Sequence, residues 1–266
     1  MCGIAGYSLS PDCSVERTLA AQALLAGIAE RGADAVGYAY RAPGAGPAHV
    51  VKQRSGASEL LDRIGVPREA TQLLVHVRDY TKGHPSIAAN NHPVRHGPVV
   101  GIHNGIIVND DELLAEFPCA RAERDMTVDS EAIFAVAAHS GSDPRALEAL
   151  RGALATAWID ERRPDTIFLA RGTGRPLWVG TGRDATFFAS TALALEVAER
   201  TLRLRFRKQE LKPGSALVLR DGAVAARRRF RPDLTYVEHD PLPAVRAPHE
   251  GEFCLTRLAA LIAAAS

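Results

Sequence analysis

Residues 2–9 read Cys-Gly-Ile-Ala-Gly-Tyr-Ser-Leu, and this apolar stretch predicts a short strand that begins at the terminus itself. Methionine before a small residue such as cysteine is normally removed in the cytosol, so Cys2 would become the first residue. It would then carry a thiol together with a free α-amine, whose pKa of about 7.7–8.0 suits a base near neutral pH. Position alone leaves two interpretations open: an N-terminal nucleophile that supplies its own base, or a small buried residue at the start of a strand.

Beyond this first strand, the chain shows runs of strands on either side of a helical middle. This order lacks the regular βαβ alternation of a Rossmann sheet and favours an α+β fold or a layered sandwich. Helices are expected at 15–30 (with Ser14 as N-cap), 110–117, 129–139, 145–154, 192–200 and 254–265. Strands are expected at 35–41, 50–54, 73–77, 99–103, 155–160, 166–170, 177–180, 185–189, 202–207, 215–219 and 223–229, with loops at 79–97 and 231–253.

Composition narrows the class of protein. The 266 residues include 32 Lys+Arg and 31 Asp+Glu, a balance that argues against nucleic acid or a membrane as partner. The four cysteines form no CxxC pair and fit a reducing compartment. No signal-peptide pattern and no apolar run of about 18 residues is present, so a cytoplasmic globular protein is expected.

Five motifs follow one another in the chain. They are Met-Cys-Gly-Ile-Ala-Gly at 1–6, Arg-Gly-Ala-Asp-Ala-Val-Gly at 31–37, Val-Arg-Asp-Tyr-Thr-Lys-Gly at 77–83, Asn-His-Pro at 91–93 and His-Asn-Gly-Ile-Ile at 103–107. Taken in this order, the set resembles the class II glutamine amidotransferase domain, and it is most like the glutaminase half of glucosamine-6-phosphate synthase. The resemblance runs from residue 2 to about residue 230.

The resemblance implies a four-layer αββα N-terminal-nucleophile hydrolase sandwich. It divides the chain into an amidotransferase domain at 1–230 and an extended tail with a short linker-like helix at 231–266. It also implies an enzyme that hydrolyses glutamine to glutamate and ammonia through a thioester on Cys2, without a cofactor.

The same resemblance assigns roles in the chemistry. Asn104, through its side chain, and Gly105, through its backbone N–H, match the residues that stabilise the oxyanion formed when Cys2 attacks the amide carbon. Without the resemblance, Asn-Gly after a strand is a common turn.

Three further residues match the substrate-binding set. Arg78 corresponds to the arginine that binds the α-carboxylate of glutamine, for which guanidinium offers a planar, bidentate match. Thr81 corresponds to a threonine of the substrate loop, and Asp129 to the acid that binds the α-ammonium. The alternatives are a surface salt bridge for Arg78 and a helix N-cap for Asp129.

Other candidate residues are interpreted as structural. The spacing of His84, His92, His96 and His103 fits no zinc pattern, so no metal is expected, and His92 is assigned a structural role. Cys13, Cys119 and Cys254 lack an α-amine and are expected to be ordinary thiols.

The sequence also departs from the synthase. The family's loop usually reads Thr-Arg-Trp-Ala-Thr-His-Gly, whereas here Asp79 replaces the tryptophan and Lys82 the histidine. The expected partner is a synthase subunit, or a missing C-terminal domain, that uses the ammonia. Residues 254–262 could dock it through an apolar helix face, or pack back on their own domain. The alternatives are a stand-alone glutaminase, another N-terminal-nucleophile amidase, and a non-catalytic regulatory module of the same fold.

Overall fold

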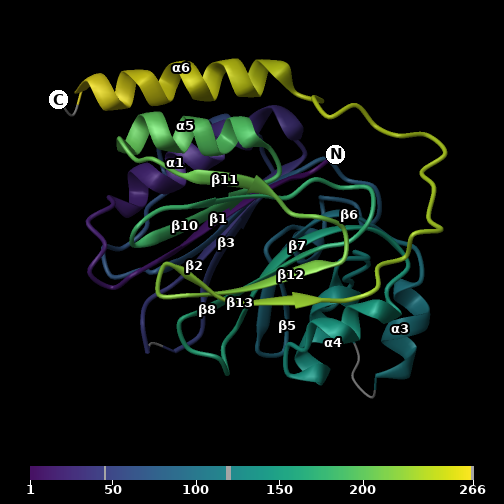
Figure 1. Ribbon diagram of the computed structural model, residues 1–266. Helices are drawn as coiled ribbons and strands as arrows, with labels where there is room; N and C mark the ends of the chain where they lie inside the picture. Colours follow the sequence, from purple (N-terminus) through teal and green to yellow (C-terminus); the bar gives the residue numbers. More distant parts are fainter. Residues whose placement is uncertain (45, 118–120, 265–266) are drawn as a thin grey trace.

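The computed structural model describes the chain except residues 45, 118–120 and 265–266. Two sheets stack face to face between layers of helices (Figure 1). Every pair of neighbouring strands runs antiparallel. This is the four-layer αββα sandwich that the resemblance implied, and the expected α+β class is confirmed.

The first sheet contains the N-terminal strand near its centre. Its order is β11-β9-β10-β1-β4-β2-β3. The strands are β1 (Gly3–Leu9), β2 (Ala35–Arg41), β3 (His49–Gln53), β4 (Gln72–Arg78), β9 (Trp178–Thr181), β10 (Ala185–Ala189) and β11 (Arg207–Glu210). In the register of β1 with β4, Gly3 lies opposite Val77, which brings Cys2 beside the end of β4.

The second sheet carries the His-Asn-Gly motif. Its order is β13-β12-β8-β7-β6-β5. The strands are β5 (Val94–His96), β6 (Val99–Ile107), β7 (Gly152–Asp160), β8 (Thr166–Arg171), β12 (Ser215–Arg220) and β13 (Ala223–Arg229). His76 Nε2 on β4 lies 3.0 Å from the carbonyl oxygen of His103 on β6, so a hydrogen bond joins the two sheets close to the site.

Helices cover the outer faces of the two sheets. On the first sheet lie α1 (Arg17–Ile28), α5 (Ala192–Leu202) and the short η1 (Ala29–Arg31) and α2 (Ala57–Leu60), and α6 (Pro248–Ala264) packs outside α1 and η1. On the second lie α3 (Asp110–Glu116), α4 (Glu131–Ser140) and η3 (Pro144–Ala149), while η2 (Ala88–Asn90) sits in the loop before β5. Within the described residues, no helix has the length and apolar character needed to cross a membrane.

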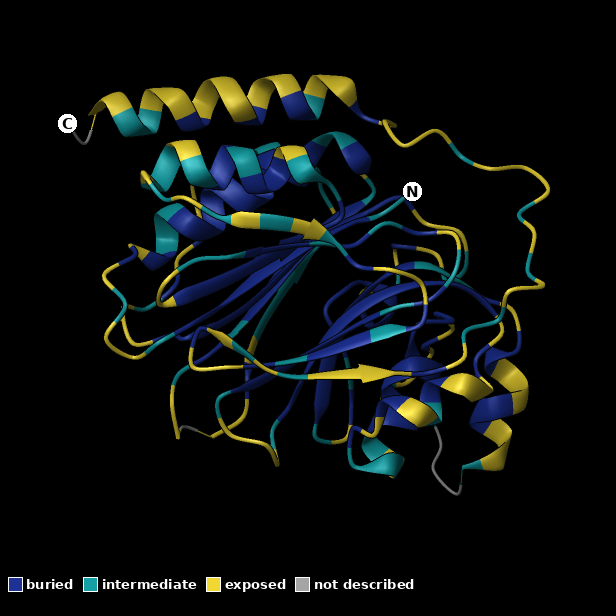
Figure 2. Cartoon of the chain, viewed as in Figure 1, coloured by how far each residue is buried: buried dark blue, intermediate teal, exposed yellow. Residues whose placement is uncertain are grey.

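Three apolar cores fill the spaces between the four layers. Leu24 and Phe187 belong to the core under α1 and α5, Ile4 and Ile102 to the core between the sheets, and Phe134 to the core under α4. Figure 2 shows the central strands of both sheets as largely buried, while exposed residues lie on the edge strands β11 and β13, the helices and the connecting segments. The strands β1 and β6 are therefore held from two sides.

The C-terminal helix packs on its own domain. Cys254 is fully buried and Leu258 is 3% exposed, and both extend the first core to the contact of α6 with α1 and η1. The Glu250 carboxylate accepts hydrogen bonds from the Ser58 amide, at 2.8 Å, and from its hydroxyl, at 2.9 Å. Phe253 and Leu255 face outward and remain 53% and 39% exposed. One side of the predicted apolar face is thus covered by this chain itself.

Several element boundaries differ from the sequence-based predictions. Helix α1 begins at Arg17 and is capped by the Glu16 side chain, which accepts from the Thr18 amide at 3.0 Å, so Ser14 is not its cap. Residues 152–154 belong to β7 instead of a helix, and η3 ends at Ala149. The predicted strand at 202–207 is wrong, because α5 runs to Leu202 and β11 starts only at Arg207. Helix α6 starts at Pro248, six residues earlier than expected.

Candidate active site

The thiol of Cys2 lies immediately before β1, and the residue is partly buried. Its Sγ donates to the main-chain oxygen of Asp79 at 3.3 Å, and Arg31 Nε donates to the Cys2 carbonyl at 2.9 Å. Burial raises the pKa of the thiol, while the contact with Asp79 and the positive charges of the N-terminus and Arg78 oppose that rise. A thiol held in its neutral form needs a nearby base before it can attack.

The oxyanion residues predicted from the sequence lie on β6. Asn104 is fully buried, and neither its Oδ1 nor its Nδ2 has a hydrogen-bond partner among the described residues. Because buried polar groups are nearly always paired, an unpaired amide here indicates a group that is held ready for a ligand. Gly105 has φ +149°, and a Cβ at this position would lie 1.9 Å from the Ala153 oxygen. Only glycine fits this backbone path. The Asn-Gly pair lies within β6, so it is part of a strand and not a turn.

Arg78 ends β4 and is 2% exposed, which excludes the surface salt bridge considered above. Its Nη1 donates to Asn91 Oδ1 at 2.6 Å, and its Nη2 donates to the carbonyl oxygens of Lys82, at 2.9 Å, and Gly83. The guanidinium therefore holds the turn of loop 79–83 at the site. Thr81 lies in this loop and is exposed.

Asp129 lies two residues before α4 and is 3% exposed. Its Oδ2 accepts from the Ile107 amide at 2.7 Å, so the carboxylate is bound to the end of β6 and does not cap the helix. Desolvation by burial raises the pKa of Asp129 to about 6. The negative charge of Asp110 also raises this pKa, whereas the hydrogen bond from the Ile107 amide lowers it. A raised pKa in a buried carboxylate beside a cleft is typical of functional sites.

One small cavity brings most of the predicted residues together. Its walls include Cys2, Arg78, Thr81, Gly105 and Asp129, while Asn104 adjoins it on β6 without lining it. The cavity has a volume of about 10 Å³, which is close to the space that one water molecule occupies. A larger cleft of about 410 Å³ lies by the end of α4 and strands β12 and β13, and it contains none of these residues.

Three histidines near the site are buried and neutral at pH 7. Desolvation lowers the pKa of both His76 and His103 to about 3, and that of His92 well below its ordinary value. His103 Nδ1 lies 2.9 Å from Ser130 Oγ and its Nε2 lies 3.2 Å from the Ala153 oxygen. His92 lines the cavity and stacks on His76, with 4.2 Å between ring centroids. Imidazoles with such low pKa values are poor bases near neutral pH.

The remaining histidines of the loop have separate partners. His84 Nδ1 lies 2.7 Å from Ser86 Oγ, and His96 Nδ1 lies 3.0 Å from Glu131 Oε1. Among the other cysteines, Cys13 and Cys254 are free thiols remote from the cavity walls, and Cys119 lies outside the described residues.

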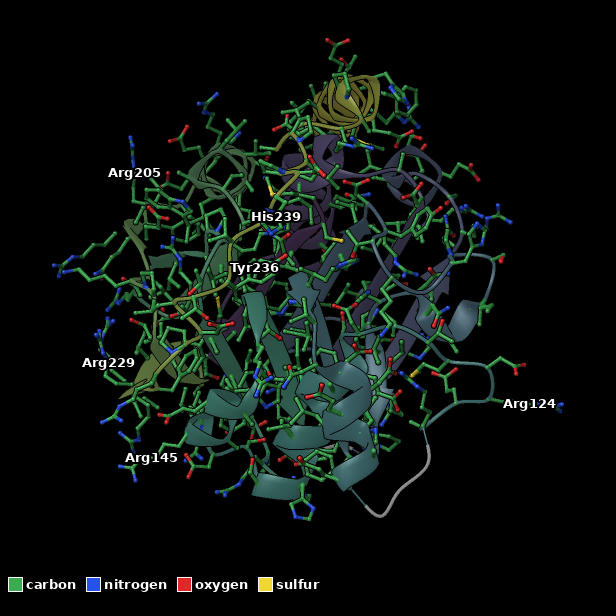
Figure 3. All side chains as sticks on the ribbon, turned by 90° about the vertical axis from the view of Figure 1, so that its right-hand side faces the viewer. Arg124, Arg145, Arg205, Arg229, Tyr236 and His239 are labelled. Atoms are coloured by element: carbon green, nitrogen blue, oxygen red, sulfur yellow. The ribbon has the colours of Figure 1, made fainter. Side chains whose placement is uncertain are left out.

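The sequence did not predict that the tail would reach the site. Residues 231–247, here called the strap, run from β13 to α6 along the edge where the N-terminus lies (Figure 1). Glu238 of the strap accepts from both Nη atoms of the buried Arg175, at 2.7 and 2.8 Å, and Arg246 Nε lies 3.5 Å from Asp79 Oδ2. Figure 3 shows the strap, with Tyr236 and His239, passing in front of the strand ends. The strap has no sequence pattern of its own, and no local signal pairs it with Arg175 or Asp79.

A second feature missed by the sequence is the role of Asp79, which was noted there only as a departure from the family. Its side chain is 10% exposed, it lines the cavity, and its carboxylate forms an ion pair with the Met1 ammonium. An acid in place of tryptophan beside a predicted N-terminal nucleophile was the one available signal.

The chain is similar in sequence to known glutamine amidotransferases. Residues 79–197 match a family described as a glutamine amidotransferase domain. The glutamine–fructose-6-phosphate aminotransferase (isomerizing) of Escherichia coli strain K12 is 34% identical over 214 residues, which are 73% of this chain and 32% of that protein. The enzyme of the same name from Zymomonas mobilis is 39% identical over 134 residues, or 46% of this chain and 21% of the relative. The chain thus spans at most about a third of the length of these relatives.

Solved structures share the fold. The glutamine phosphoribosylpyrophosphate amidotransferase of B. subtilis, complexed with ADP and GMP, aligns with 86% of this chain and 49% of its own, with a TM-score of 0.64 at 19% identity. A structure described as the allosteric regulatory enzyme of purine biosynthesis aligns over the same shares with a TM-score of 0.66. At this identity the likeness establishes the arrangement of the strands and helices.

Proposed function

This chain carries a class II glutamine amidotransferase domain, and from that premise we propose that it hydrolyses the side-chain amide of L-glutamine to glutamate and ammonia. The resemblance drawn from the five motifs is confirmed at the level of this domain. The observation that carries the proposal is the convergence of Cys2, Arg78, Gly105 and Asp129 on one cavity from four separate parts of the chain.

The nucleophile in this proposal is Cys2 after removal of Met1. The buried thiol passes its proton to the free α-amine, and the sulfur attacks the amide carbon of glutamine, which gives a tetrahedral oxyanion. When the C–N bond breaks, the ammonium returns the proton to the leaving nitrogen, which departs as ammonia. Water then hydrolyses the γ-glutamyl thioester to release glutamate. The neutral, hydrogen-bonded His103 does not compete as base.

The oxyanion is assigned to Asn104 and Gly105. The Asn104 amide is buried and unpaired among the described residues, so it needs no rearrangement of existing bonds to donate. Preorganised donors of this kind stabilise developing charge in a site from which water is excluded, and loss of one such donor typically costs about 100- to 1,000-fold in kcat.

Recognition of the amino-acid end is assigned to Arg78, Asp129 and Thr81. Arg78 supplies positive charge for the α-carboxylate, and Asp129 supplies negative charge for the α-ammonium. The two charges discriminate against amides that lack an amino-acid head group, which argues against a different N-terminal-nucleophile amidase. Their presence with Cys2 also argues against a non-catalytic regulatory module.

The destination of the ammonia is a second part of the proposal. We assign residues 1–230 to the amidotransferase domain and residues 231–266 to a tail that connects or docks to a synthase, as a subunit or as a further domain. Release of free ammonia by a stand-alone glutaminase is the alternative. The reaction is placed in the cytoplasm, where free thiols such as Cys2, Cys13 and Cys254 stay reduced.

The test is to incubate the processed protein with L-glutamine and to measure glutamate and ammonia. Cys2→Ala is expected to abolish turnover, and Cys13→Ala, which removes a thiol outside the cavity, is expected to retain it. Intact mass establishes that Met1 is absent from each sample. Equal turnover in wild type and Cys2→Ala, or none in processed wild type, would overturn the proposal.

A further inference from the structure

Asp79 contacts the Cys2 thiol and the terminal ammonium, which in this structure belongs to Met1. Its carboxylate forms an ion pair with the ammonium at the chain's first residue, and its main-chain oxygen accepts from the Cys2 thiol at 3.3 Å. The side chain is 10% exposed and lines the cavity. One residue thus bridges the sulfur and the terminal amine.

The peptide around Asp79 is fixed by its neighbours. The Asp34 amide donates to the carbonyl of Arg78 at 3.0 Å, and Asp34 Oδ2 accepts from the Tyr80 amide at 2.9 Å. Gly32 lies against the same peptide, since a Cβ there would come within 2.4 Å of the Arg78 carbonyl. Asp79 is therefore held on both sides along the backbone, and its carboxylate is directed at the N-terminus by the fold.

Catalytic nucleophiles with an adjacent base often have a third group that orients the base and stabilises its charged form. We infer that Asp79 is this positioning residue: its carboxylate holds the α-amine of the processed Cys2 over the thiol and stabilises the ammonium that forms when the thiol gives up its proton. The inference rests on the proposed function of Cys2. The proton moves from the Cys2 sulfur to the Cys2 amine nitrogen. The Asp79 carboxylate stays negative throughout, so no other proton donor or acceptor is needed.

Removal of Met1 shifts the terminal nitrogen inward by one residue, a Cα spacing of 3.8 Å. Arg246 Nε, 3.5 Å from Asp79 Oδ2, lies on the strap side of the carboxylate. Of the other acids near the site, Glu238 is engaged by both Nη atoms of Arg175, and Asp129 Oδ2 accepts from the Ile107 amide. Asp79 is thus the acid placed to accept the new ammonium.

The test compares Asp79→Asn and Asp79→Glu with wild type, each produced with Cys2 as first residue by cleavage of an N-terminal tag and checked by intact mass. Two quantities are measured: the rate of Cys2 alkylation by iodoacetamide without substrate, and kcat and KM for glutamine. Asp62→Asn is the charge-matched control, because Asp62 pairs with Arg257 on the surface formed by α6. Arg246→Ala controls for loosening of the strap.

The alkylation rate distinguishes the inference from a simple charge effect, because the two predict opposite changes of that rate in Asp79→Asn. A carboxylate that only lies near the sulfur disfavours the thiolate, so Asp79→Asn would then react faster. If Asp79 orients the base, Asp79→Asn is expected to react about 10-fold more slowly and to lose about 10- to 100-fold in kcat, with KM within about twofold. Asp79→Glu should recover most of the loss, while Asp62→Asn and Arg246→Ala should not react more slowly than wild type.

An unchanged or faster alkylation rate in Asp79→Asn would overturn the inference, and so would a kcat within about twofold of wild type. The alkylation assay needs no glutamine. If processed wild type fails to hydrolyse glutamine, the proposed function fails while the alkylation ratio still decides the role of Asp79.

Discussion

Asp129→Asn should stabilise the fold while it weakens glutamine binding. The Asp129 carboxylate is buried, and desolvation raises its pKa from 3.8 to about 6. At about 1.4 kcal/mol per unit, keeping this group ionised costs the folded state about 3 kcal/mol at pH 7. Asparagine has the same shape, can still accept from the Ile107 amide, and carries no charge.

The pH dependence of the effect follows from the direction of the shift. Between pH 3.8 and 6 the folded protein binds this proton more tightly than the unfolded chain, so wild type loses stability as pH rises through that window. Above pH 6 the loss is complete. The free energy of unfolding of Asp129→Asn minus that of wild type should therefore rise by up to about 3 kcal/mol between pH 4 and pH 7.

Urea unfolding at pH 4, 5, 6 and 7 measures this difference. Ser130→Ala, a neighbouring change that removes a polar group and no carboxylate, is the control. Any constant offset from the new amide group cancels in the comparison across pH. A difference that stays flat from pH 4 to 7 would show that Asp129 is not destabilised by burial. Glutamine KM at pH 7.5 should rise about 30-fold or more, because one partner of a buried charge pair is lost.

Three other substitutions test separate parts of the structure. Gly105→Ala places a Cβ 1.9 Å from the Ala153 oxygen at φ +149°, so the melting temperature and kcat should both fall, and a kcat equal to wild type would contradict the assigned geometry. Leu258→Ala should cost about 2–5 kcal/mol in urea unfolding if α6 packs as described, whereas the 39% exposed Leu255→Ala should change little. Arg175→Ala breaks the paired bonds to Glu238, so limited proteolysis should cut the strap several-fold faster, and an unchanged rate would show that this ion pair does not hold it.

The candidate site residues came from the family resemblance, and two of them lie at the ends of predicted strands. Cys2 and Arg78 could be placed because each sits at the boundary of a short apolar run, and the pairing of β1 with β4 brings those ends together. Five of the six predicted residues line one cavity, and Asn104 adjoins it. The roles assigned to these residues remain predictions until the variants are assayed.

Local patterns failed where distant contacts decide the structure. Leu204 and Phe206 alternate with arginines as in a strand, but both pack against the core below α5 from a segment that pairs with no strand. Arg246 reaches Asp79 across 167 positions of sequence. The Asp79 carboxylate and the Met1 ammonium meet only because β1 and β4 are neighbours in the first sheet. No spacing rule encodes such contacts, since they depend on sheet order and on the course of the strap.

Under the proposed function, the small cavity would couple recognition of glutamine to movement of loop 79–83. The cavity of about 10 Å³ has room for about one water molecule, so glutamine would need part of the wall to move. Arg78 donates to the carbonyls of Lys82 and Gly83, and a carboxylate accepts from a guanidinium more strongly than a neutral carbonyl does. The α-carboxylate of glutamine would therefore take the place of these carbonyls, and the same exchange would release the loop. The Lys82 ammonium, 2.7 Å from both oxygens of the buried Asp110, would keep the loop tethered at its side chain while its backbone moves.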